Sequence, residues 1–121
     1  IAWGIVTNKS RVLTEPLLKY IGYDTRSACV VCGDTTPQSK PHPEPLLYAC
    51  KLIKVNPADC IYIGDAVTDI EAGKAAGMRT IAAGFGFIPQ DVSPATWQAD
   101  VLVNSAIEIL PWIKQWFPNI R

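Results

Sequence analysis

Short apolar runs alternate along this chain with stretches whose apolar residues recur at helical spacing, and this alternation restricts the fold more than any other feature. Near-continuous apolar strands are typical of parallel sheets that helices cover on both faces. Strand–helix–strand order with short connections therefore predicts a three-layer α/β/α fold with a parallel sheet. The predicted strands are Ile1–Thr7, Ser27–Gly33, Cys60–Gly64, Arg79–Ala83 and Ala99–Val103.

Helices are predicted between these strands. The first has an apolar face that ends at Ile21, before Gly22, which is a suitable C-terminal cap. Because Pro16 lacks an N–H, this helix either starts near Thr14 or bends at the proline. The other expected segments are an irregular stretch at Pro37–Pro45, helices at Leu46–Ile53 and Asp69–Ala76, a loop at Gly84–Phe87, and a last helix from Ser105 to Phe117 that Pro111 divides.

The composition is that of one packed globular domain without internal repeats. The chain has 121 residues, of which 49% are apolar, and this length is enough for one domain with a core. Its formal net charge is zero and no basic cluster occurs, so nothing indicates nucleic-acid binding. No apolar stretch approaches the ~18 residues that a membrane span needs. Without a secretory signal pattern, a cytoplasmic location is expected.

Four cysteines occur, and Cys29 and Cys32 have the C-x-x-C spacing of redox and metal sites. Both lie in a predicted buried strand, where side chains three residues apart point to opposite faces. This geometry is poor for a disulfide or a shared metal. Burial as small core residues is therefore favoured.

The segment Gly64–Asp69 places two carboxylates, Asp65 and Asp69, where a predicted strand turns into a helix. Ligands bind at this edge of open α/β sheets, and Mg²⁺ takes one or two carboxylates together with water and substrate phosphate. The helix dipole alone would explain Asp69, but a simple turn explains Asp65 poorly. The segment therefore predicts a metal and phosphate site.

Two further segments should meet this site, because the ends of parallel strands lie at one edge of a sheet. Thr7 and Asn8 follow the first strand, where a hydroxyl and backbone N–H groups can hold a phosphate; helix capping is the simpler alternative for these two alone. Lys40 and His42 each precede a proline that restricts the backbone. Two interpretations of Lys40 are open: it is directed at a phosphate, or it is an ordinary surface lysine. His42 is more typical of an exposed or locally bonded residue than of a catalytic base.

Together these segments resemble the second, third and fourth motifs of the haloacid dehalogenase superfamily, in the same order and on the same elements. They look most like its phosphoglycolate phosphatase branch, and the chain is similar to bacterial phosphatases that act on phosphoglycolate or on N-acetylmuramic acid 6-phosphate. The resemblance covers essentially all 121 residues and implies a Rossmann-like core domain. The segments that carry it are Thr7-Asn8-Lys9, Cys32-Gly33-Asp34, Lys40–Leu47, Gly64–Gly77 and Gly84-Phe85-Gly86.

The resemblance implies an Mg²⁺-dependent phosphomonoester hydrolase that acts on a small phosphate ester. Thr7 would hydrogen-bond the transferring phosphoryl group beside Asn8, and Lys40 would neutralise charge on the nucleophile and the phosphoryl oxygens. Asp65 would ligate Mg²⁺ directly, and Asp69 would hold a metal-bound water or support the site. Such a clamp stabilises charge spread over the equatorial oxygens.

The family's first motif, a strand ending in Asp-x-Asp that supplies the nucleophile and the general acid/base, has no counterpart here. The cap domain that lies between the first and second motifs is missing as well. We therefore expect residues 1–121 to be the C-terminal portion of a single core domain and to be inactive alone. The missing strand would lie between the Ile1–Thr7 and Ile61–Gly64 strands, and the two unpaired edges would promote self-association.

Three other functions stay open. A dehalogenase of the same superfamily needs no metal, so Asp65 and Asp69 argue against it. A sugar-phosphate mutase is an alternative, because specificity in the superfamily resides largely in the cap. A non-catalytic domain that binds phosphate or a partner is the third.

Overall fold

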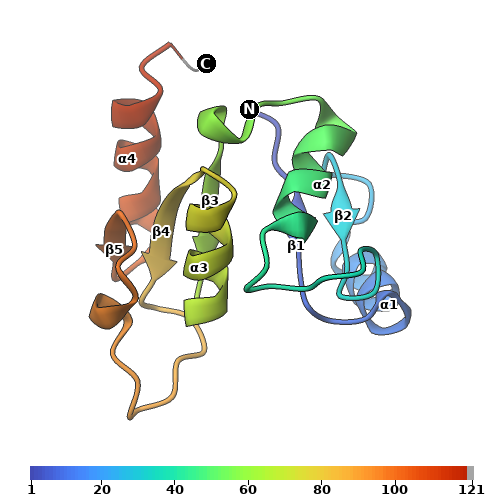
Figure 1. Ribbon diagram of the computed structural model, residues 1–121, viewed down its shortest axis with the longest axis horizontal. Helices are drawn as coiled ribbons and strands as arrows, with labels where there is room; N and C mark the ends of the chain where they lie inside the picture. Colours follow the sequence, from blue (N-terminus) through green and yellow to red (C-terminus); the bar gives the residue numbers. More distant parts are fainter. Residues whose placement is uncertain (120–121) are drawn as a thin grey trace.

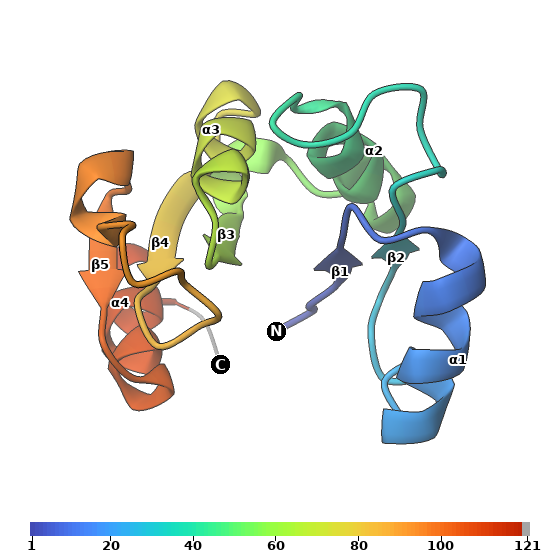
Figure 2. The same ribbon diagram turned by 90° about the horizontal axis from the view of Figure 1, so that it is seen from below.

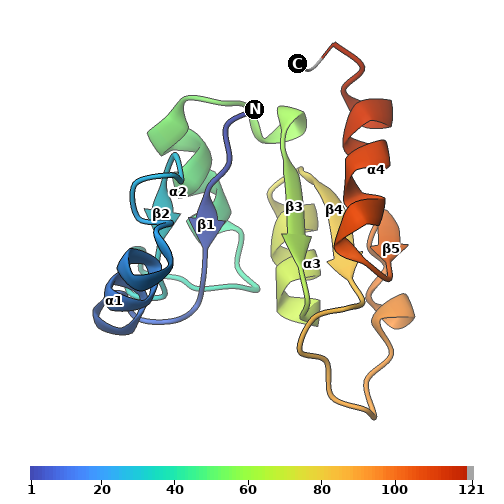
Figure 3. The same ribbon diagram turned by 180° about the vertical axis from the view of Figure 1, so that it is seen from behind.

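Parallel strands form two separate sheets in this computed structural model, which describes residues 1–119. Within these residues β1 pairs with β2, and β4 lies between β3 and β5 in the second sheet. Figure 3 shows all the strands side by side and pointing the same way, with β1 and β3 facing each other. The strands are β1 (Ile5–Val6), β2 (Val30–Val31), β3 (Ile61–Gly64), β4 (Arg79–Ala83) and β5 (Val101–Val103).

Helices cover both faces of the sheets (Figure 1). They are α1 (Arg11–Ile21), α2 (Glu44–Ile53), α3 (Val67–Ala75) and α4 (Ile109–Trp116), with 3₁₀ turns at Pro57–Asp59, Pro94–Trp97 and Ala106–Glu108. In Figure 2, α2 and α3 lie on one side of the strands, and α1 and α4 lie on the other. The three-layer α/β/α arrangement predicted from the sequence is therefore confirmed. Across residues 1–119, no helix combines the length and apolar character that membrane crossing requires.

Helix packing joins the two sheets. The fully buried Leu46 of α2 packs against Ala72 of α3, and Val6 of β1 and Tyr62 of β3 contact the same cluster. The first sheet and the second therefore share a core on the face covered by α2 and α3, although no strand connects them within the described residues.

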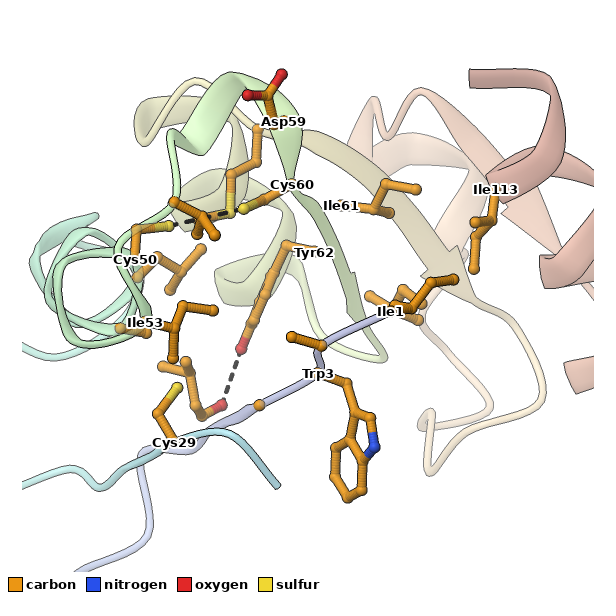
Figure 4. A pocket seen from close by; sticks show the side chains of 18 of the residues that line it. Ile1, Trp3, Cys29, Cys50, Ile53, Asp59, Cys60, Ile61, Tyr62 and Ile113 are labelled. Carbon is orange, nitrogen blue, oxygen red and sulfur yellow. Dashed lines mark hydrogen bonds between the residues drawn. The ribbon is translucent and has the colours of Figure 1, made fainter. Parts of the chain in front are cut away.

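An apolar groove separates β1 from β3. Its volume is about 430 Å³, and its walls include Val6 on one side and Ile61 and Ile63 on the other, with Ile113 of α4 at its border (Figure 4). The inner edges of β1 and β3 border this groove, and neither pairs with a further strand of residues 1–119. The sequence predicted unpaired edges at this place.

The first two strands are shorter than the sequence predicts. β1 and β2 have two residues each, whereas Ile1–Thr7 and Ser27–Gly33 were expected to be strands. Hydrogen bonds continue beyond the regular ladder, since Ala28 N donates to Trp3 O at 2.7 Å. The regular ladder between them covers only the pairs Ile5–Val30 and Val6–Val31.

Helix starts also differ from the sequence prediction. α1 begins at Arg11, before Thr14, and continues through Pro16. α2 begins at Glu44, so Pro45 lies in its first turn, where the missing N–H of a proline costs nothing. Three more elements begin at other residues than predicted: β3 at Ile61 rather than Cys60, β5 at Val101 rather than Ala99, and α3 at Val67 rather than Asp69. The last helix divides before Ile109 rather than at Pro111. The bounds of β4 are those predicted.

Candidate active site

Lys40 and Asp69 form a buried ion pair near the carboxyl end of β1. Lys40 Nζ lies 2.6 Å from Asp69 Oδ1, and the two side chains are 8% and 10% exposed. Nζ also donates to the Tyr62 hydroxyl at 2.8 Å and to the Val6 carbonyl at 3.0 Å. Each of the three ammonium protons therefore has an acceptor, which holds the cation in one position.

The second carboxylate oxygen of Asp69 organises the turn from β3 into α3. Oδ2 accepts hydrogen bonds from the backbone N–H groups of Asp65 and Ala66, both at 3.1 Å. Its place in the first turn of α3 is also favoured by the helix dipole. Both oxygens of Asp69 are thus engaged by the protein itself, and the residue fixes the segment that carries Asp65.

Gly64 permits this turn because a side chain there has no room. A Cβ at Gly64 would lie 2.2 Å from Asp69 Cβ and 2.4 Å from its Oδ2. We expect Gly64→Ala to reduce the free energy of unfolding by about 1–3 kcal/mol, since the turn or Asp69 must move. Urea unfolding measures this change.

Gly77→Ala is the control for that substitution. Gly77 has a φ of +82° and nothing within 4 Å of a Cβ, so only the backbone preference changes. We expect this variant to keep the activity of the whole protein, whereas Gly64→Ala loses activity because Asp65 is displaced. Full activity and stability in Gly64→Ala would contradict the arrangement described for Asp69.

Asp65 is half-buried, and one of its oxygens accepts a hydrogen bond from the loop after β4. Its Oδ2 accepts from Phe87 N at 3.1 Å, and a Cβ on Gly86 would lie 2.3 Å from Asp65 Cβ, so the loop after β4 lies against this carboxylate. Among the described residues, Oδ1 has no hydrogen-bond partner. A carboxylate oxygen held this way suits Mg²⁺. Within residues 1–119, no group of three or more His, Cys, Asp or Glu side chains is placed to hold a metal ion, so further ligands would have to come from water, from phosphate or from residues outside these 121.

Asn8 is engaged with the backbone of Lys40. The Asn8 side chain donates to Lys40 O at 3.0 Å and accepts from Lys40 N at 3.1 Å. Thr7 Oγ1 accepts from Lys9 N at 3.1 Å, which closes a local turn after β1. The structure thus brings the end of β1 to the lysine segment, as predicted, and Asn8 acts there by positioning Lys40.

Two sequence features have the local roles that their patterns favoured. His42 is exposed, and its Nδ1 accepts from Glu44 N at 3.0 Å. Cys29 and Cys32 are both buried with free thiols, and burial raises the pKa of Cys29. Neither feature adds a group to the candidate site.

Tyr62 is the member of the site that the sequence analysis missed. Its hydroxyl accepts from Lys40 Nζ and donates to the Val6 carbonyl at 2.9 Å. Burial, together with the negative charge of Asp69, raises the pKa of Tyr62 far above its ordinary value, so the hydroxyl stays protonated. The sequence does carry a signal for this role, because Tyr62 brings a polar hydroxyl into the apolar run that ends at Gly64.

The parallel strands and the helices on both faces define an open α/β domain, and the candidate polar groups lie at the edge of the sheets where such domains usually bind ligands. A sequence profile of the family described as "Haloacid dehalogenase-like hydrolase" matches residues 1–83. The chain belongs to this family. A solved structure of a predicted phosphoglycolate phosphatase from Haemophilus somnus has the same fold, with a TM-score of 0.84 and 27% identity over 92% of this chain and 49% of that chain.

Curated relatives carry the names of two phosphatases. The chain is 42% identical over 109 residues to N-acetylmuramic acid 6-phosphate phosphatase of Pseudomonas putida, covering 90% of this chain and 49% of that protein. It is 48% identical over 102 residues to phosphoglycolate phosphatase of Xylella fastidiosa, covering 84% of this chain and 44% of that protein. The chain thus spans about half the length of the curated relatives it matches. The family resemblance predicted from the motifs is confirmed.

Proposed function

We propose that the whole protein is an Mg²⁺-dependent phosphomonoester hydrolase that acts on a small phosphorylated metabolite. The observation that carries this proposal is the chain of contacts from Lys40 through Asp69 to the backbone of Asp65. These contacts support the proposal because they bring a fixed cation and a carboxylate with an available oxygen together where the strands end. Phosphoryl transfer is catalysed mainly by such positioning and charge stabilisation.

The residues of this chain have distinct roles in the proposal. Lys40 neutralises charge on the phosphoryl oxygens, and the Thr7 hydroxyl donates a hydrogen bond to the same group beside Asn8. Asp65 ligates Mg²⁺ through its available oxygen, while Asp69 supports the site by holding both Lys40 and the Asp65 backbone. When bound, Mg²⁺ supplies further charge neutralisation on the phosphoryl oxygens.

The nucleophile is proposed to come from a strand that carries Asp-x-Asp and occupies the groove between β1 and β3. The apolar walls of the groove and the two inner strand edges support this, since a strand there would pair on both sides. No Asp-x-Asp occurs within the 121 residues. We therefore propose that these residues alone are inactive and that their exposed edges self-associate.

A cytoplasmic location belongs to the same proposal. The proposed substrates carry a phosphate charge, and burying a charge in hydrocarbon is costly. Small phosphate esters therefore stay in the compartment where they form, which is where a hydrolase of this kind would act.

The proposal is tested by incubating the whole protein with a panel of small phosphate esters, with Mg²⁺ or with a chelator. The panel includes phosphoglycolate and N-acetylmuramic acid 6-phosphate, because the curated relatives carry these two names. We expect phosphate release from at least one ester with Mg²⁺ and none with chelator. Residues 1–121 alone are expected to release none.

Each contrary outcome has a definite meaning. A sugar-phosphate mutase would give an isomeric sugar phosphate without phosphate release. A non-catalytic domain would bind phosphate and turn over nothing. Hydrolysis by residues 1–121 alone, at a rate similar to that of the whole protein, would contradict the proposed source of the nucleophile.

A further inference from the structure

Cys50 and Cys60 bring their thiols together at the wall of the apolar groove. Cys50 lies in α2, and Cys60 lies directly before β3. Their Sγ atoms are 3.9 Å apart, and Figure 4 shows the two side chains pointing toward each other. Both residues line the groove, and neither has a part in the proposed phosphoryl transfer.

We propose that Cys50 and Cys60 are an oxidation site that forms a reversible disulfide with a hydroperoxide as oxidant. The sulfurs must approach from 3.9 Å to the disulfide bond length of about 2.0 Å, a shift of less than about 2 Å. The proposal requires that rotation of the two side chains supply a movement of this size. The bond would tie the C-terminal half of α2 to the start of the strand that leads to Asp65.

A bound metal explains this pair less well than oxidation does. A soft metal ion such as Zn²⁺ usually takes four ligands, or three and a water. In the described part of the chain, no third His, Cys, Asp or Glu joins the two thiols in a cluster that could hold a metal. Two thiols without further ligands are suited to a disulfide.

The burial of the two thiols decides which of them reacts with the hydroperoxide first. Cys50 is 5% exposed, and burial together with the neighbouring Cys60 raises the pKa of Cys50 to about 12, so its thiol is protonated at neutral pH. Cys60 is half-buried in residues 1–119, where the groove that it lines is open. Because peroxide reaches the more exposed sulfur more easily, Cys60 reacts first, and the attack proceeds through its thiolate form.

Disulfide formation between Cys50 and Cys60 needs no reagent other than the hydroperoxide. The Cys60 thiolate attacks one peroxide oxygen, the O–O bond breaks, and Cys60 becomes a sulfenic acid with release of hydroxide or alkoxide. The Cys50 sulfur then attacks the Cys60 sulfur, the S–O bond breaks, and the leaving hydroxide takes the Cys50 proton as water. Two thiols lose two electrons, and the peroxide gains them.

The test is a peptide map of the whole protein after treatment with hydrogen peroxide. Trypsin releases Cys60 in the peptide 55–74 and Cys50 in the peptide 27–51, because the Lys40–Pro41 bond resists cleavage. We expect mass spectrometry without reductant to show these two peptides joined, with the loss of two hydrogen atoms. Dithiothreitol should separate them. Oxidation of Cys60 to a sulfinic acid without a joined peptide would overturn the proposal.

Matched variants identify the partner, since the peptide 27–51 also contains Cys29 and Cys32. Cys50→Ala should abolish the joined peptide, and Cys29→Ala should leave it unchanged. These two substitutions remove buried thiols of similar exposure, 5% and 9%. A joined peptide that persists in Cys50→Ala, or that disappears in Cys29→Ala, would assign the bond elsewhere. The oxidised wild type should also unfold at a higher temperature than the reduced protein, and Cys50→Ala should lose this shift on oxidation.

Discussion

Asp65→Asn in the whole protein is expected to lower Mg²⁺-dependent kcat/KM by about a hundredfold or more. The substitution replaces the proposed anionic metal ligand with a neutral amide, so Mg²⁺ should bind more weakly and be held less well against the phosphoryl oxygens. The fold should be unaffected. The amide oxygen of Asn can still accept the hydrogen bond that Asp65 Oδ2 receives from Phe87 N.

Asp24→Asn provides the matched control, because it makes the same chemical change at an exposed carboxylate. Asp24 lies between α1 and β2, at the end of the first sheet opposite the candidate site. Steady-state kinetics at several Mg²⁺ concentrations should show the loss in Asp65→Asn alone. Unchanged turnover in that variant would remove Asp65 from the metal site.

Lys40→Met should lower both turnover and stability. The remaining carboxylate of Asp69 would be buried without a cation, and breaking a buried ion pair in this way typically destabilises a protein by 3–5 kcal/mol. The Val6 carbonyl and the Tyr62 hydroxyl would lose a donor as well. We expect a fall of about 3 kcal/mol in the free energy of unfolding, together with a lower kcat rather than only a higher KM.

A double variant separates the ion pair from the lysine's packing. Combining Lys40→Met with Asp69→Asn removes both charges, so the double variant should be more stable than the sum of the two single changes predicts. Lys51→Met, on the exposed side of α2, should change stability by less than about 0.5 kcal/mol. Two results would contradict the role assigned to Lys40. One is strict additivity of the two stability changes in the double variant, and the other is a higher KM with an unchanged kcat in Lys40→Met.

The sequence predicted the layers and the order of elements because local apolar patterns carry that information. β4 has its predicted bounds, since it is paired on both sides and its residues from Thr80 to Ala83 are buried. β1 and β2 are shorter than predicted because the length of a ladder depends on pairing between residues far apart in the chain, which no local pattern encodes. α1 and α2 begin earlier than predicted for a different reason. The prediction took a proline as the boundary of each helix, but both helices contain that proline.

For the candidate site, the sequence predicted which residues would gather but not how they would be bonded. Lys40, Asp65 and Asp69 do lie at one edge, as strand-end positions indicated. That Asp69 Oδ1 pairs with Lys40, and that the Tyr62 hydroxyl holds the same lysine, depends on contacts between residues far apart in the chain. Such contacts become visible only when the elements are packed together.

A crystal structure of the whole protein with Mg²⁺ and inorganic phosphate tests the central claim most directly. The account predicts that an Asp65 carboxylate oxygen ligates the metal, that Thr7 contacts the phosphate beside it, and that Lys40 Nζ exchanges one of its three protein acceptors for a phosphate oxygen. A metal bound away from Asp65, or a phosphate without contact to Lys40, would contradict the account.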